Sequence, residues 1–153
     1  MNYTAPYRID DRKVRFAIVG CGRISGRHVD ALVEHDERAE LVAVCDNDPD
    51  VLAAAAKRLD KPGFASIEAM LNESDADVVV LCTPSGLHSA QAIEVAKGGR
   101  HVLTEKPMAT RLADGKRMVA ACDDEGVRLF VVKQNRLNPT LQLLKQAFVA
   151  RRF

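Results

Sequence analysis

The sequence lacks an excess of charge of either sign, and it lacks a long apolar run. Its 22 lysines and arginines nearly balance its 21 aspartates and glutamates over 153 residues. A balanced charge gives no sequence-wide field for nucleic acid or an anionic membrane surface, so we expect neither as a partner. Since no apolar stretch approaches the roughly 18 residues of a membrane span, and residues 1–12 are too polar for a secretory signal, we predict a cytoplasmic protein.

Cysteine pairs at metal-binding or redox spacing are also lacking. The four cysteines are Cys21, Cys45, Cys82 and Cys122, and no two of them form a C-x-x-C motif. We therefore predict free thiols and no metal site. Cys21 is the thiol to watch for oxidation, although a small side chain that fills space beside the backbone is the better interpretation.

The most informative stretch that is present runs from Val14 to Gly26. Its apolar first half predicts a buried strand, and it breaks into three glycines, Gly20, Gly22 and Gly26. We interpret these as a dinucleotide-binding motif of the G-x-G-x-x-G kind, at a tight turn from a strand into a helix. In that motif Gly20 permits the turn, Gly22 lets the backbone approach a pyrophosphate, and Gly26 lets the helix pack closely on the strand. The start of the helix would stabilise the phosphate charge.

An acidic residue follows the second predicted strand, residues 41–45. A carboxylate at Asp46 can accept hydrogen bonds from both hydroxyls of an adenosine ribose and would repel a 2′-phosphate. Because no lysine or arginine follows closely, the expected cofactor is NAD. The alternative is that Asp46 or Asp48 only caps the helix that begins near Pro49; we assign Asp48 to the cap and Asp46 to the ribose.

Hydrophobic patterning along the chain predicts alternating strands and helices in a single α/β domain. We expect strands at 14–19, 41–45, 64–65, 77–82, 101–104 and 128–133, and helices at 23–36, 50–59, 67–71, 85–97, 110–125 and about 140–149. Ile24, Val29, Leu32 and Val33 should face the sheet, and Ser85 and Thr110 should cap their helices. This alternation is typical of a doubly wound parallel sheet, the Rossmann fold, with strand order 3-2-1-4-5-6.

Polar residues follow five of the six predicted strands. They are Gly20 to Arg23, Asp46, Thr83-Pro84, Glu105-Lys106-Pro107 and Gln134-Asn135-Arg136. Because ligands bind at the carboxyl ends of such strands, we predict a site there. Lys106 could pass a proton to or from a substrate hydroxyl in a closed cleft, and the alternative is a solvated lysine in a turn. For His28, a packing or surface role is favoured over a ligand role.

Three segments resemble the Gfo/Idh/MocA oxidoreductases: the glycine turn Gly20 to Ile24, Thr83-Pro84 followed by His88, and above all Gly99 to Pro107. The resemblance covers nearly all of the chain after Arg12. It implies oxidation or reduction of a sugar or cyclitol carbinol with a nicotinamide cofactor. The cofactor-binding residues that it implies are Gly20, Gly22, Arg23, Ile24, Asp46, Thr83, Pro84, His88, Glu105, Lys106 and Gln134. Lys106 is the implied catalytic residue, and Lys106, Asn135 and Arg136 are the implied substrate-binding residues.

Within that family, residues 131–140 are similar to UDP-N-acetylglucosaminuronate dehydrogenases of bacterial lipopolysaccharide synthesis, with Leu137 where an aromatic residue is expected. This likeness implies oxidation of the 3-hydroxyl of a UDP-sugar uronate, with 2-oxoglutarate as a co-substrate in some relatives. We also expect the full-length protein to be a homo-oligomer. The alternatives are another sugar or inositol dehydrogenase of the family, or a non-catalytic NAD-binding regulatory module. A methyltransferase fits less well, because the Glu105-Lys106-Pro107 turn has no use there.

We expect a leader at residues 1–12, a dinucleotide-binding domain at 13–137, and a helix at 138–153 that leads into a C-terminal substrate domain. The resemblance implies that this further domain supplies a histidine acid/base and most of the substrate pocket. Because the chain stops at Phe153, we expect a fragment that binds NAD but turns over poorly alone. Leu141, Leu144 and Phe148 should then be left exposed.

Overall fold

The computed structural model describes residue 9 and residues 11–152. Most of the predicted leader lies outside the described residues. The elements are, in chain order, β1 (Val14–Val19), α1 (Ser25–Glu34), β2 (Ala39–Cys45), α2 (Pro49–Leu59), β3 (Gly63–Phe64), α3 (Ile67–Glu73), β4 (Val78–Leu81), α4 (His88–Lys97), β5 (His101–Thr104), α5 (Leu112–Asp124), β6 (Leu129–Val131), the 3-10 helix η1 (Gln134–Leu137) and α6 (Pro139–Val149).

The strands form one six-stranded sheet in the order β3-β2-β1-β4-β5-β6, and each neighbouring pair is parallel. This confirms the predicted doubly wound sheet. The chain first winds outward through β2 and β3, then crosses back so that β4 pairs with β1. The carboxyl ends of β1 and β4 therefore flank the point where the winding reverses, which is where ligands bind in folds of this kind.

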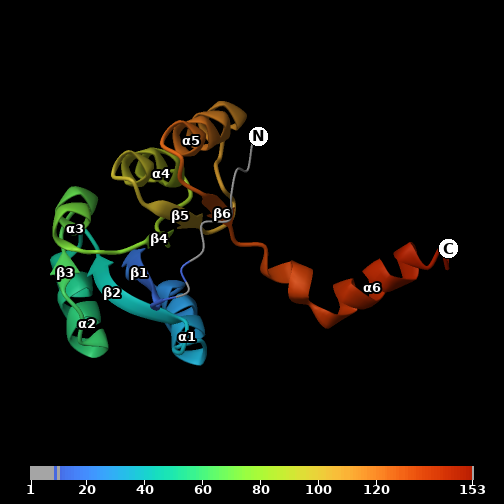
Figure 1. The fold of residues 1–153 in the computed structure, drawn as a ribbon, viewed down its shortest axis with the longest axis horizontal. Helices are drawn as coiled ribbons and strands as arrows, with labels where there is room; N and C mark the ends of the chain where they lie inside the picture. Colours follow the sequence, from blue (N-terminus) through green and yellow to red (C-terminus); the bar gives the residue numbers. More distant parts are fainter. Residues whose placement is uncertain (1–8, 10, 153) are drawn as a thin grey trace.

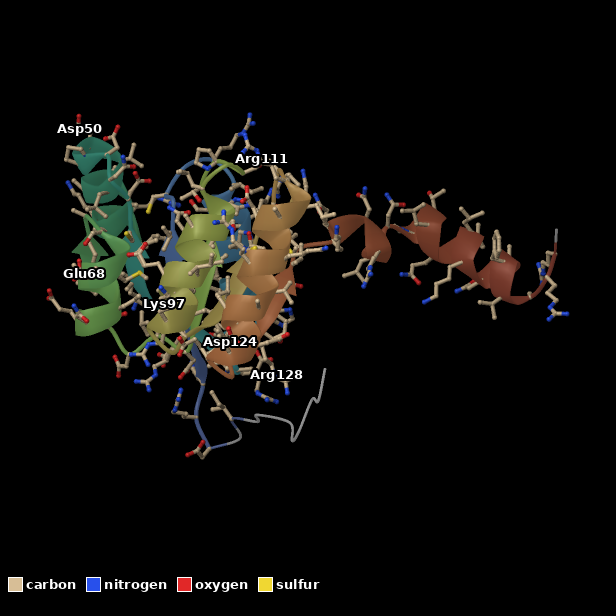
Figure 2. The ribbon with its side chains drawn as sticks, turned by 90° about the horizontal axis from the view of Figure 1, so that it is seen from above. Asp50, Glu68, Lys97, Arg111, Asp124 and Arg128 are labelled. Carbon is tan, nitrogen blue, oxygen red and sulfur yellow. The ribbon has the colours of Figure 1, made fainter. Side chains whose placement is uncertain are left out.

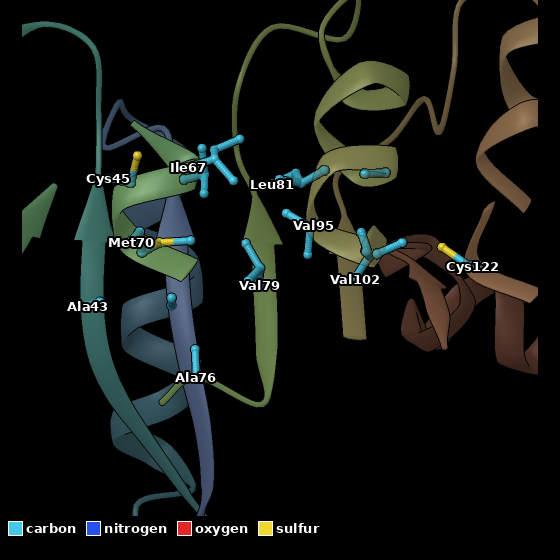
Figure 3. Packing of buried hydrophobic residues seen from close by; sticks show 14 of the residues in the cluster. Ala43, Cys45, Ile67, Met70, Ala76, Val79, Leu81, Val95, Val102 and Cys122 are labelled. Carbon is cyan, nitrogen blue, oxygen red and sulfur yellow. The ribbon is translucent and has the colours of Figure 1, made fainter. Parts of the chain in front are cut away.

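Helices cover both faces of the sheet (Figure 1). The helices α3, α4 and α5 lie on one face, and α1 and α2 lie on the other. The larger core lies under α3, α4 and α5, where residues of β1, β2, β4 and β5 meet the apolar sides of these helices (Figure 3). A smaller cluster beneath α1 contains Ile18, Val80 and Cys82, with Val29 and Leu32 packed against it. All four residues of β4 are buried, as expected for a strand covered on both faces.

The helices differ from the sequence predictions in their bounds, in two caps and in two side chains expected to face the sheet. The helix α1 begins at Ser25 rather than Arg23. Ile24, which precedes this helix, and Val33, which lies within it, are 41% and 69% exposed instead of facing the sheet. Neither Ser85 nor Thr110 caps a helix, because α4 and α5 begin two or three residues later. Residues 84–87 form a turn first, in which the Leu87 N–H donates to the Pro84 carbonyl.

The helix α6 extends away from the sheet, joined to it through η1 (Figure 2). Leu141, Leu144 and Phe148 are 44%, 51% and 71% exposed, which confirms that the apolar side of this helix is uncovered in the described chain. Among the helices of the described residues, none has the length and apolar character needed to cross a membrane.

Asp77 ties the chain before β1 to the start of β4. Its Oδ2 accepts hydrogen bonds from Arg12 Nη1 over 2.6 Å and from the Arg15 N–H over 2.8 Å, and its Oδ1 accepts from Arg12 Nη2 over 2.8 Å. Its side chain is only 12% exposed. The Arg12 hydrogen bonds are the main reason that the pKa of Asp77 lies below its ordinary value, and burial partly opposes them. Asp77 therefore stabilises the fold as a carboxylate.

We predict that Asp77→Asn lowers the free energy of unfolding at pH 7 by about 1–2 kcal/mol, because the charge-assisted hydrogen bonds are weakened. Since the folded-state pKa is lower than the unfolded value of about 3.9, this stabilisation is present above about pH 4 and is lost as the pH falls through the folded-state pKa. Urea unfolding as a function of pH measures this. The matched control is Asp75→Asn, whose side chain is 73% exposed and should change stability by less than about 0.5 kcal/mol. An equal loss from both variants would contradict the prediction.

Candidate cofactor and active site

The glycine turn, residues 20–24, is shaped by Gly20. Its φ is +88°, a conformation that L side chains rarely adopt, and its N–H donates to the Cys45 carbonyl over 2.8 Å. A Cβ atom at this position would lie 2.9 Å from the backbone carbon of Cys82 and from the nitrogen of Thr83. Only glycine therefore fits between the end of β1 and the end of β4.

The predicted role of the third glycine is wrong. Three residues separate Gly22 from Gly26, so the third position of a G-x-G-x-x-G motif is Ser25. Ser25 is 3% exposed, and its hydroxyl donates to the Gly22 carbonyl over 2.6 Å. A Cβ atom at Gly26 would meet no other part of the described chain within 4 Å, so close packing does not require glycine there. A buried serine fills the position and holds the turn closed.

Asp46 accepts hydrogen bonds with both of its carboxylate oxygens. The Cys21 N–H donates to Oδ2 over 2.7 Å, and the Asp48 N–H donates to Oδ1 over 3.0 Å. Asp48 itself accepts from the N–H groups of the first turn of α2, which confirms it as the cap. Asp46 thus joins the glycine turn to the β2 edge, and its role toward a ribose stays a prediction.

A cavity of about 510 Å³ opens between these turns, which we call the glycine-turn cavity. Its lining residues are Val19, Gly20, Gly22, Cys45, Asp46, Asn47, Ala65, Ser66, Ile67, Cys82, Thr83, Pro84, Leu87, Gln91 and Glu94. Within the described chain, its lining includes two carboxylates, Asp46 and Glu94, and no lysine or arginine. A second negative charge close to the adenosine end of a dinucleotide would strengthen discrimination against a 2′-phosphate.

The remaining residues of the glycine turn, Arg23 and Ile24, lie exposed between Gly22 and α1. Thr83 lines the glycine-turn cavity, and its hydroxyl donates to the side-chain oxygen of Gln91 in α4. His88 is 1% exposed, and its Nε2 and Nδ1 lie 2.8 Å from the Thr83 carbonyl and 3.0 Å from the Pro107 carbonyl. Contact between His88 and a cofactor stays a prediction. Its observed contacts connect the Thr83-Pro84 turn to the Lys106-Pro107 turn.

The three thiols near the glycine turn are poor nucleophiles. Burial is the main cause that raises the pKa of Cys21 to about 11 and the pKa values of Cys45 and Cys82 to about 12. All three therefore remain protonated near neutral pH, which argues against oxidation chemistry at Cys21. All four cysteines are free in the structure. Among the described residues, no group of three or more His, Cys, Asp or Glu side chains could hold a metal ion.

Glu105 and Lys106 follow β5 directly. Glu105 is 9% exposed, and its Oε2 accepts the Lys106 N–H over 3.1 Å. Its Oε1 lies 3.0 Å from Nε2 of His28, which comes from α1. The sequence prediction that His28 has a packing or surface role missed this pair, because the two residues are 77 positions apart and no spacing rule connects them.

Lys106 faces a second cavity of about 840 Å³, which we call the lysine cavity. Its lining residues are Lys106, Val132, Lys133, Gln134, Asn135, Arg136, Leu141, Gln142 and Lys145. The fold thus brings Lys106 together with Gln134, Asn135 and Arg136, as predicted for a common edge of the sheet. Four of these described lining residues are cationic and none is acidic. This arrangement suits an anionic ligand.

A parallel sheet of order 3-2-1-4-5-6 with a glycine turn at its reversal point defines a dinucleotide-binding domain of the Rossmann class. The family model described as "Oxidoreductase family, NAD-binding Rossmann fold" matches residues 14–133. The chain belongs to this family, Gfo/Idh/MocA, which confirms the resemblance seen in the sequence.

Two solved structures share more than half of their aligned residues with the chain. The WlbA dehydrogenase from Bordetella pertussis, in complex with NADH and UDP-GlcNAcA, is 60% identical with a TM-score of 0.91, over 93% of this chain and 43% of that one. The WlbA dehydrogenase from Chromobacterium violaceum, with the same two ligands, is 56% identical with a TM-score of 0.94, over 100% of this chain and 44% of that one. D-apiose dehydrogenase from Paraburkholderia graminis is 34% identical over 89% of this chain and 36% of its own length. The chain therefore spans less than half the length of each of these three relatives.

Proposed function

We propose that the protein carrying this chain is an NAD-dependent dehydrogenase that oxidises the 3-hydroxyl of UDP-N-acetylglucosaminuronate, UDP-GlcNAcA, in lipopolysaccharide synthesis. The observation that carries the proposal is the 60% and 56% identity to two WlbA dehydrogenases that bind NADH and UDP-GlcNAcA. Relatives with other substrates, such as D-apiose dehydrogenase and a myo-inositol 2-dehydrogenase, are only 34% and 30% identical. The difference supports the nucleotide-sugar substrate over the inositol alternative.

The glycine-turn cavity suits NAD. The turn at Gly20 and Gly22 would hold the pyrophosphate, with the start of α1 behind it. Asp46 and Glu94 would favour free ribose hydroxyls over a 2′-phosphate. When bound, NAD supplies the acceptor for the substrate hydride. The residues of the glycine-turn cavity would bind and orient the cofactor, and Lys106 would move the proton of the substrate hydroxyl.

The lysine cavity suits the proposed substrate. UDP-GlcNAcA carries a diphosphate and a carboxylate, so it has several negative charges, whereas inositol has none. Lys133, Arg136 and Lys145 would attract such a ligand, and Arg136 can form two parallel hydrogen bonds to a carboxylate. Lys106 lines the same cavity at the end of β5. In its neutral amine form it would take the proton of the substrate hydroxyl as the hydride leaves the carbon, and it would become an ammonium group.

The wider assignments are proposals of the same kind. We place the cofactor domain at residues 13–137 and a connection to a substrate domain at residues 138–153, whose exposed leucines on α6 offer a surface for that domain. Homo-oligomer formation, reduction of 2-oxoglutarate to regenerate NAD, and a cytoplasmic location complete the proposal. Each is testable on the protein that carries this chain.

The test is turnover of the protein that carries this chain, followed by NADH absorbance, with UDP-GlcNAcA, myo-inositol and D-apiose as separate substrates. Among the three substrates, we expect NADH to form only with UDP-GlcNAcA. Added 2-oxoglutarate should then lower the NADH absorbance, because its reduction converts NADH back to NAD, while more oxidised sugar forms per molecule of NAD. Preference for inositol or apiose would instead support another dehydrogenase of the family. Tight NAD binding without turnover of any of the three would support a regulatory module.

A separate prediction concerns the cofactor. Asp46→Ala should weaken NAD binding, measured by calorimetry, more than NADP binding, because the carboxylate repels only the 2′-phosphate. The expected change in the NAD/NADP preference is about tenfold, or 1.4 kcal/mol. Asp48→Ala is the matched control, since it removes the cap of α2 without changing the preference. Equal weakening of both cofactors by Asp46→Ala would indicate that Asp46 serves only the backbone of the turn.

A further inference from the structure

We infer that His28 is a positioning residue for Lys106 and that it acts through Glu105. The inference rests on the proposed role of Lys106 as the residue that moves the substrate proton. It adds a residue of α1 to the group of residues at the end of β5 that would position and move the substrate proton.

The Glu105 carboxylate has two partners, one on each oxygen. His28 Nε2 lies 3.0 Å from Oε1, and the Lys106 N–H donates to Oε2 over 3.1 Å. The side chains of His28 and Glu105 are only 14% and 11% exposed. Because a shielded pair is screened less by solvent than a surface pair, it holds its geometry more firmly. The carboxylate therefore fixes the backbone from which the Lys106 side chain extends.

His28 also connects this carboxylate to the glycine turn. It lies three residues after Ser25, whose N–H and hydroxyl both donate to the Gly22 carbonyl. Residues three apart on a helix lie on neighbouring parts of its surface. The helix that begins at the pyrophosphate-binding turn therefore carries, one turn later, the imidazole that meets Glu105. Through the contacts from Gly22 to Ser25 and from His28 to Glu105, α1 would set the position of Lys106 relative to a cofactor held at the glycine turn.

Alternative roles for His28 are less well supported. Its one ring nitrogen with a described partner faces a carboxylate, and that carboxylate directly precedes Lys106 in the chain. His28 does not line the lysine cavity as described, so the structure gives it no contact with a substrate there. A purely packing role would not require a polar partner placed on the turn of the catalytic lysine.

The experiment uses the protein that carries this chain, with the variants His28→Gln, Glu105→Gln and the double variant. We expect kcat to fall about tenfold in each single variant, with the KM for UDP-GlcNAcA and the Kd for NAD changed less than threefold. The double variant should be no slower than the slower single variant, because the two residues act as one unit. His35→Gln is the matched control, since His35 directly follows the same helix and is exposed, and the kcat of this variant should not change.

An unchanged kcat in His28→Gln would overturn the inference. Multiplied losses in the double variant would also overturn it, because they indicate two independent residues. A parallel loss of NAD affinity and kcat would show that His28 acts on the glycine turn instead. Lys106→Met separates these results from failure of the proposed function: if that variant keeps its turnover, the role of Lys106 itself is wrong, whatever His28 does.

Discussion

Replacing Lys106 with methionine is expected to lower kcat of the protein that carries this chain by about 10²–10⁴, the usual contribution of a general acid or base. Methionine keeps most of the length of the side chain but cannot take a proton. NAD affinity, measured by calorimetry, should change less than threefold, because Gly20, Gly22 and Asp46 are untouched. Steady-state kinetics with UDP-GlcNAcA provide the measurement.

The matched control is Lys145→Met, which removes a lysine from the same cavity. Lys145 lies on α6 and should contribute attraction to the anionic substrate, so KM should rise while kcat is retained. If Lys145→Met lowers kcat as much as Lys106→Met does, the cavity only attracts the substrate and Lys106 has no special chemical role. Retained turnover in Lys106→Met would remove the catalytic assignment entirely.

Gly20→Ala is expected to lower the free energy of unfolding by about 3 kcal/mol, from a strained backbone together with a steric clash. The added Cβ would need a φ of +88° and would lie 2.9 Å from the backbone of Cys82 and Thr83. Backbone atoms at the ends of β1 and β4 cannot move aside without disturbing the paired strands. Urea unfolding gives the change in stability directly.

Gly22→Ala is the matched control for Gly20→Ala, since a Cβ there meets nothing within 4 Å in the described chain and the backbone is not left-handed. Its stability should change by less than about 0.5 kcal/mol. The larger Gly22→Val should instead abolish NAD binding by filling the space where the pyrophosphate is expected. Similar stability losses at both glycines, or full NAD affinity in Gly22→Val, would contradict this division of roles.

The sheet was predictable because its strands are short apolar runs, and the residues that break those runs are the ones that turn at its carboxyl edge. Asp48 was predictable as a cap for a similar reason, since Pro49 follows it directly and local spacing determines the geometry. The Lys106 turn and Arg136 were placed at one edge correctly, because parallel strands bring their ends together.

The errors have a common physical origin. Ser85 and Thr110 have the residue type of a helix cap, but further non-helical residues follow each of them before α4 and α5 begin at His88 and Leu112. Helical periodicity placed Val33 on the side of α1 that faces the sheet. The residues of α1 that pack against the smaller cluster are Val29 and Leu32. The pair between His28 and Glu105 depends on α1 meeting the turn after β5 in space, which a single sequence does not encode in any spacing.

The two hydrogen bonds that Asp46 accepts from the backbone limit how the coenzyme preference of this domain can be redesigned. A designer who removes the carboxylate to admit NADP also removes the acceptor for the Cys21 and Asp48 N–H groups, and so loosens the turn that must hold the pyrophosphate. A successful design must keep an uncharged acceptor at position 46 and add a cation elsewhere on the rim, for example at Asn47. Coenzyme exchange here is therefore a problem of at least two coordinated substitutions, and libraries that vary position 46 alone should yield mainly weak binders of both coenzymes.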